Sequence, residues 1–120
     1  MTIPNIVEVA TINAVTEVGV LTTTLTTNLL SADVVDEYVY KINVLRCTNI
    51  TDSDATVTFD VEKSGTIKFL ANEVTVPANS VVDITDKNST FYLEETDLIR
   101  GGASAGTAID CIISYEKMAD

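Results

Sequence analysis

The sequence predicts an all-β protein: a single antiparallel β-sandwich, of the jelly-roll or immunoglobulin-like kind, with an extended N-terminal segment. Apolar and polar residues alternate with period two along most of the chain, and the alternating stretches are rich in Val, Ile and Thr. Turn-forming residues interrupt these stretches at intervals of about eight to twelve residues, which is typical of sandwiches and barrels. Helix has little support anywhere in the chain.

The clearest strand covers residues 56–62. Its apolar residues are expected to face inward, and they are Val57, Phe59 and Val61. Its polar residues are expected to face water, and they are Thr58, Asp60 and Glu62. The Lys-Ser-Gly tripeptide that follows predicts a tight turn, in which Gly65 is free to adopt positive φ. Residues 66–70 then return as the second strand of a hairpin, with Ile67 and Phe69 on one face.

A further strand is predicted upstream, over residues 38–47. One of its faces carries Tyr38, Tyr40, Ile42 and Val44. The alternation blurs over 45–47, as it does at a β-bulge or in a more buried stretch. Inward packing beside Phe59 and Phe69 is the simplest explanation of the two tyrosines, although paired tyrosines also anchor partners. Polar residues 49–54 end the strand, because Asn, Asp and Ser side chains cap their own turns.

The second half of the chain supplies the remaining strands. Residues 73–76 and 81–85 are expected to form an antiparallel pair around a turn that begins at Pro77. Another turn is predicted at 86–89. Short strands are expected at 91–93 and 98–100, and the last strand is expected at 108–115. In the last strand the inward face consists of Ile109, Cys111, Ile113 and Tyr115.

Residues 15–31 carry two conflicting signals. Leu21, Leu25 and Leu29 recur every fourth residue, as on one face of a helix. The threonines between them are poor helix formers, so a strand is favoured. We therefore expect the sandwich domain to span residues 15–120.

Residues 1–14 are too apolar for a disordered tail. Two interpretations are equally supported: an arm that orders against a neighbouring subunit, and a first edge strand of the sandwich. As an arm, this segment is the expected docking element. Its candidate interaction residues are Ile3, Pro4, Ile6, Val7 and Val9.

The charge balance disfavours nucleic acid as a partner. Eighteen acidic and seven basic residues give a net charge of −11, which repels phosphates and suits solubility, a salty medium or a basic partner. No apolar run approaches the length of about 20 residues that a membrane helix needs, so no membrane association is expected. The N-terminus lacks the basic start and the apolar middle of a secretory signal, which indicates synthesis and use in the cytosol.

The chain also lacks the residues that common catalytic and metal sites require. It has no His, which removes imidazole bases and histidine ligands. Cys47 and Cys111 are expected to be two buried thiols. The alternative, a disulfide between them, requires that their strands be neighbours. The acidic run at 94–97 is expected to be solvated turn charge, and the run at 52–54 to be a turn and not a calcium loop. We expect a flexible loop at 101–106, no catalytic residues, no metal and no cofactor.

Seven short segments, in this order, resemble a family of small virion structural proteins of tailed bacteriophages, many of them aquatic. The segments are YKINVL (40–45), TNI (48–50), TVTFDV (56–61), FLA (69–71), VPANS (76–80), FYLEETD (91–97) and ISYE (113–116). The resemblance spans roughly residues 20–117. Thr96 stands where the family usually has Gly.

The resemblance implies a β-sandwich that assembles on the phage particle, with no catalytic residues to carry over. A capsid decoration or cement subunit is the expected role, and a ring or fibre-base component of the neck or tail is the alternative. The implied partners are the major capsid protein or neck and tail proteins. The protein is also expected to form a homo-oligomer, either a trimer or a ring. Its expected location is the virion, which is assembled in the host cytoplasm.

Two hypotheses from other classes stay open. The first is a carbohydrate- or receptor-binding module that uses Tyr38 or Tyr92, because sandwiches also serve that purpose. The second is an acidic enzyme that uses Glu94, Glu95 or Asp97.

Overall fold

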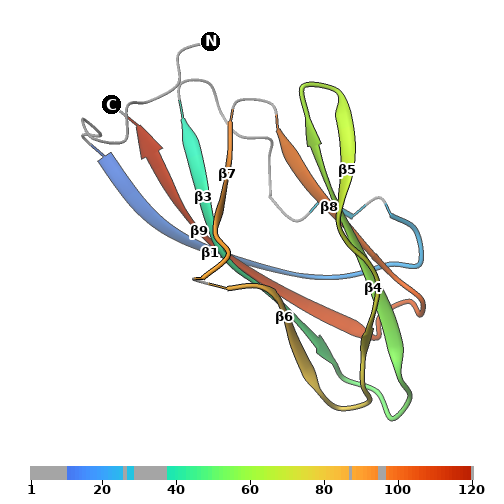
Figure 1. Cartoon of the computed structure of the whole chain (residues 1–120). Helices are drawn as coiled ribbons and strands as arrows, with labels where there is room; N and C mark the ends of the chain where they lie inside the picture. The colour runs from blue at the N-terminus through green and yellow to red at the C-terminus, as the bar shows by residue number, and fades with distance from the viewer. Residues whose placement is uncertain (1–10, 26, 29–37, 87, 95–96, 120) are drawn as a thin grey trace.

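A computed structural model describes residues 11–25, 27–28, 38–86, 88–94 and 97–119, and these residues form nine strands and no helix. The strands are β1 (Thr11–Val20), β2 (Thr27–Asn28), β3 (Val39–Asn49), β4 (Ala55–Lys63), β5 (Thr66–Val76), β6 (Val81–Thr85), β7 (Phe91–Leu93), β8 (Leu98–Ala103) and β9 (Ile109–Ala119). Figure 1 shows them as two layers, which confirms the predicted all-β sandwich.

The strand order identifies the kind of sandwich. Sheet A has the order β1-β9-β3-β6, with β7 also paired to β3, and sheet B has the order β2-β8-β4-β5. Every pairing is antiparallel. Because β9 occupies one edge of β3, β6 and β7 share the other edge and act as one interrupted strand. If β6 and β7 are counted as one strand, the sixth, then β8 is the seventh strand of the chain and β9 is the eighth. The order of strands is then first, eighth, third and sixth in sheet A, and second, seventh, fourth and fifth in sheet B, which is the jelly-roll arrangement.

The core lies between the inner faces of the two sheets. Its fully buried apolar side chains include Leu21, Ile42, Leu45, Phe59, Leu93, Ile99, Ile109 and Ile113. Phe59 reaches β8 at Gly101, where a Cβ atom would stand 2.6 Å from the Phe59 ring and 2.9 Å from Leu21. Gly101 therefore gives the ring the space it occupies. The predicted inward face of β9, from Ile109 to Tyr115, is confirmed.

The predicted hairpin between β4 and β5 is present, but its second strand faces the opposite way. Ser64 and Gly65 both have positive φ, 52° and 82°, as a two-residue hairpin turn requires. This turn pairs Glu62 with Ile67, so Ile67 lies on the outer face. Phe69 is also on the outer face and is 62% exposed. The expectation that it packs inward beside the tyrosines is wrong, because the turn length sets the register.

The predicted tyrosine packing is otherwise observed in β3. Tyr40 is buried and stacks on Tyr115 with ring centroids 4.9 Å apart. Of the two explanations given for the blurred alternation at 45–47, a bulge is observed, since the register of β3 against β6 shifts after Leu45. A second shift, against β9, lies near Asn43 and was not predicted.

Three further expectations are corrected. β6 does not pair with β5: it pairs with β3, because the turn that begins at Pro77 carries the chain from sheet B to sheet A. Residues 101–103 are not a loop, because they belong to β8 and are buried. Asp60 does not face water: it is 1% exposed and pairs with Arg100.

The first described strand clarifies the N-terminal part of the chain. β1 begins at Thr11 and pairs along its whole length with β9, so residues 11–14 belong to the outermost strand of sheet A among the described residues. The boundary expected after residue 14 therefore lies inside β1. Residues 1–10 lie outside the described residues.

Candidate functional site

The candidate interaction residues chosen from the sequence lie outside the described residues. They are Ile3, Pro4, Ile6, Val7 and Val9. The docking role of this segment therefore stays a prediction. In the turns at 51–54 and 86–89 the described residues are exposed, as expected, apart from Thr51, which is half-buried.

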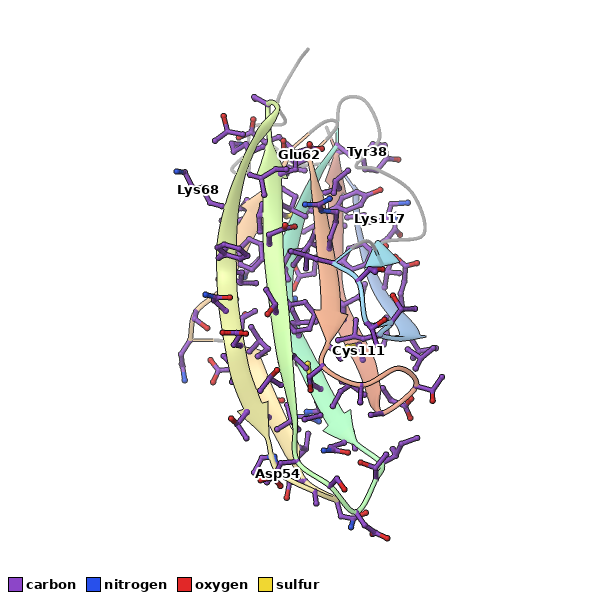
Figure 2. The ribbon with its side chains drawn as sticks, turned by 90° about the vertical axis from the view of Figure 1, so that its right-hand side faces the viewer. Tyr38, Asp54, Glu62, Lys68, Cys111 and Lys117 are labelled. Atoms are coloured by element: carbon purple, nitrogen blue, oxygen red, sulfur yellow. The ribbon has the colours of Figure 1, made fainter. Side chains whose placement is uncertain are left out.

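The two tyrosines considered for ligand binding do not form one platform. Tyr38 is half-buried against the core, and the Lys117 ammonium lies 5.5 Å from its ring centroid. Figure 2 shows these two residues at the same end of the molecule, far from Asp54. Tyr92 is 44% exposed and lies opposite Lys41, on the outer face of sheet A. Tyr38 lies two residues before Tyr40, which faces inward, and it packs against the core from the same face. Tyr38 and Tyr92 therefore lie on opposite faces of the sheet.

Two of the three carboxylates considered for catalysis stabilise a turn. Asp97 is 2% exposed and accepts hydrogen bonds from the backbone N–H of Glu94 and from Lys63 Nζ, both at 2.9 Å. Glu94 Oε1 lies 3.4 Å from the same ammonium. The hydrogen bond to Asp97 raises the pKa of Lys63. Glu95 lies outside the described residues.

The acidic turn after β3 connects two loops. Asp54 Oδ1 accepts a hydrogen bond from the backbone N–H of Ala78 at 2.9 Å, and Asp52 Oδ1 accepts one from Asn79 Nδ2 at 2.9 Å. These bonds hold the turn after β3 against the turn after β5. Across the described ranges, no group of three or more Cys, Asp or Glu residues is placed to hold a metal ion. The described part of the chain contains no helix that meets the length and hydropathy of a membrane span.

The two cysteines are neighbours on the inner face of sheet A. Cys47 lies opposite Cys111 on adjacent strands, and their Sγ atoms are 3.9 Å apart. Both thiols are free and buried, as one of the two sequence interpretations predicts. The contact with Cys111 and burial raise the pKa of Cys47, so this thiol stays protonated.

A groove of about 330 Å³ lies on the outer face of sheet B. One wall is the chain segment at Thr23 and Leu25, which lies over Gly102: a Cβ atom there would be 2.8 Å from the carbonyl oxygen of Thr24. The opposite wall belongs to β5. The residues that line the groove are Thr23, Leu25, Thr56, Thr58, Phe69, Asn72, Glu73, Gly102, Ala103 and Ser104.

An unusual backbone conformation shapes the β5 wall. Glu73 has φ of 51°, a conformation that costs a non-glycine residue about 1 kcal/mol or more. Its backbone N–H donates a hydrogen bond to Thr58 Oγ1 at 3.1 Å, which holds the bulge against the groove floor. The register between β4 and β5 shifts on both sides of Phe59. Two bulges therefore bend β5 where Asn72 and Glu73 reach the groove.

The outer face of sheet A carries a second candidate surface, which is apolar. Val18 on β1 is 78% exposed and lies opposite Ile112 on β9, which is 40% exposed. Val20, two residues further along β1, is 41% exposed. β1 is the terminal strand of sheet A among the described residues. We call Val18, Val20 and Ile112 the sheet A patch.

Both surfaces were missed from the sequence. The groove depends on bulges in β5, and its one advance signal is the break of alternation over 70–73. Comparison of the chain with protein-family models, with curated proteins and with solved structures finds no match.

Proposed function

We propose that this protein is a structural subunit of a tailed-phage particle, and that it decorates the capsid surface. The observation that carries the proposal is the jelly-roll strand order, because jelly rolls recur in viral capsid proteins. Lectin domains share this architecture with viral capsid proteins. Between these two classes, the sequence resemblance over residues 20–117 favours a virion protein.

The distribution of apolar residues agrees with a protein that works through its outer surfaces. Side chains fill the interior between the sheets, where Phe59, Ile42 and Ile113 are buried. The sheet A patch is exposed, and two of its three residues lie on β1, the ten-residue strand that is outermost in sheet A among the described residues. Exposed apolar residues at a strand edge favour contact with another protein. We therefore place the capsid contact on the sheet A patch and the edge of β1.

The test is binding of the purified protein to phage particles that lack it, followed by sedimentation and mass-determined copy number. Val18→Lys and Ile112→Lys place a charge in the proposed contact and are expected to abolish incorporation. Ile67→Lys is the matched control, because Ile67 is 45% exposed on the outer face of the other sheet. Unchanged incorporation of both sheet A variants, or no binding of the parent protein to any particle, would refute the proposal.

The N-terminal segment is tested separately. Removal of residues 1–10 leaves β1 intact, whereas a cut after residue 14 removes part of that strand. The shorter truncation is expected to leave a folded domain that no longer joins the particle. Full incorporation of this truncated protein would exclude the segment as the docking element.

Copy number separates the two positions on the particle. A number on the order of hundreds fits capsid decoration, whereas the copies of a single ring fit a neck or tail component. The same measurement gives the symmetry of the bound oligomer.

A further inference from the structure

The groove on sheet B has the size and the chemistry of a small-ligand site. Its volume of about 330 Å³ lies within the range of roughly 300–1,000 Å³ that such sites occupy. In Figure 2, β5 and β4 lie in front, so sheet B is turned toward the viewer. The lining residues come from β4, β5, β8, the segment that precedes β2 and Ser104, which follows β8.

The lining combines one aromatic ring with closely spaced polar groups. Phe69, 62% exposed, supplies a flat apolar surface. Hydroxyl groups come from Thr23, Thr56, Thr58 and Ser104, an amide from Asn72 and a carboxylate from Glu73. Within the described residues, the side chains of Asn72 and Glu73 make no hydrogen bond to the protein. They are therefore free to bind a ligand.

Part of this polar set is held in place by the protein. Thr58 Oγ1 accepts the backbone N–H of Glu73 at 3.1 Å, and Ser104 Oγ accepts the backbone N–H of Thr56 at 2.9 Å. Each of these hydroxyls keeps a hydrogen that it can donate outward. The groove thus presents donors and acceptors together, beside a ring, on strands of a packed sheet.

A saccharide matches this combination. A pyranose ring has an apolar C–H face that can lie on an aromatic ring, and a rim of hydroxyls that both donate and accept hydrogen bonds. We propose that the groove binds a neutral saccharide, with Phe69 under the sugar ring and Asn72 and Glu73 on its hydroxyls.

Charge favours a neutral sugar over an anionic one. The charged side chain in the lining is the carboxylate of Glu73, and the whole chain carries a net charge of −11. The nearby guanidinium of Arg100 is engaged in two hydrogen bonds with Asp60. Sialylated, uronic or phosphorylated sugars would meet repulsion with no free cation in the lining to offset it.

The experiment titrates the intact, isotope-labelled protein with neutral oligosaccharides of glucose, mannose and galactose, and follows backbone amide resonances. A glycan array that also contains anionic glycans is probed in parallel. Binding is expected to shift resonances of β5, β4 and β8 around the groove, and to be strongest for a neutral glycan. The array presents immobilised chains and the titration presents short free oligosaccharides, so the two arms together distinguish a surface polysaccharide from a free sugar.

Matched variants separate this groove from other surfaces. Phe69→Ala is expected to weaken binding about tenfold, since ring stacking is lost, and Glu73→Gln severalfold. Ile67→Ala is the control, because Ile67 is exposed on the same strand and does not line the groove. All three residues are exposed, and thermal melting checks that the variants fold.

Three outcomes overturn the proposal: no neutral saccharide shifts the groove resonances at millimolar concentration, Phe69→Ala binds as tightly as the parent, or an anionic glycan binds most tightly. A protein occupant gives a different pattern. In that case Phe69→Ala reduces incorporation into particles while no sugar binds, and the proposal fails.

Discussion

The guanidinium of Arg100 holds the buried carboxylate of Asp60 through two parallel hydrogen bonds. Arg100 Nε donates to Oδ1 at 3.0 Å and Nη2 donates to Oδ2 at 2.6 Å. The side chain of Asp60 is 1% exposed and that of Arg100 is 27% exposed. The two residues lie opposite each other on β4 and β8, so the pair joins the two central strands of sheet B.

Arg100→Met is expected to destabilise the protein because it leaves the Asp60 charge buried and unpaired. Loss of one partner from a buried pair costs roughly 3–5 kcal/mol, and the partial exposure of Arg100 places the expected value near the lower end. The measurement is urea unfolding of the variant. Arg46→Met is the matched control, because Arg46 makes a similar two-bond pair with Asp83 whose side chains are 49% and 34% exposed. That control should lose much less stability, because solvent screens an exposed ion pair, and equal losses in both variants would contradict the argument.

Gly101→Ala is expected to destabilise the core. The added Cβ would stand 2.6 Å from the Phe59 ring and 2.9 Å from Leu21, both buried. Overpacking of this kind costs about 1–3 kcal/mol. Gly19→Ala is the control, since nothing lies within 4 Å of its Cβ position, and it should change the free energy of unfolding little. Thermal and urea unfolding of both variants measure the difference, and a neutral Gly101→Ala would show that Phe59 can move.

The sandwich could be predicted from period-two alternation because each strand has one face in a shared core. The central strands follow that rule most closely: Val57 and Phe59 on β4, and Ile109 and Ile113 on β9, are buried. Strand pairing could not be predicted in the same way. The Pro77 turn changes sheets, whereas the Gly65 turn does not, and both resemble hairpin turns in sequence.

The candidate sites were harder to predict than the fold, because they depend on register. Phe69 was predicted to face inward, and this was wrong because the register of the hairpin differs by one residue from the expected one. A shift of one residue moves every side chain of a strand to the other face of the sheet. Alternation alone carries no information on the bulge at Glu73, which a hydrogen bond from a different strand holds in place. Similarly, Asp60 is polar in sequence and buried in the fold because Arg100 covers it.

Cys47 and Cys111 are expected to react with thiol reagents only when the protein unfolds. Both are buried, and the raised pKa of Cys47 keeps it as the unreactive thiol. Modification by a water-soluble disulfide reagent, followed across a urea series, should rise together with the unfolding transition. Rapid modification of the native protein in the absence of urea would contradict this expectation, and Cys47→Ala or Cys111→Ala would then identify the reactive thiol.

The hydroxyl of Tyr115 makes the stability of the protein sensitive to alkaline pH. It donates a hydrogen bond to Glu17 Oε2 at 2.6 Å from a side chain that is 4% exposed. Burial, followed by the contact with Glu17, raises the pKa of Tyr115 above its ordinary value of about 10. The unfolded chain therefore loses this proton first as pH rises. The stabilisation is complete below about pH 10 and is lost above it, as the pH rises toward the folded-state pKa.

Tyr115→Phe tests this contribution by removing the hydroxyl while keeping the ring that stacks on Tyr40. At neutral pH the variant should lose on the order of 1 kcal/mol, the value of one buried hydrogen bond. Between about pH 9 and 11 its unfolding free energy should fall less steeply than that of the parent, because one proton fewer is released on unfolding. Tyr92→Phe is the control on an exposed ring. Parallel pH profiles for the parent and Tyr115→Phe would mean that Tyr115 ionises equally easily in the folded and unfolded states.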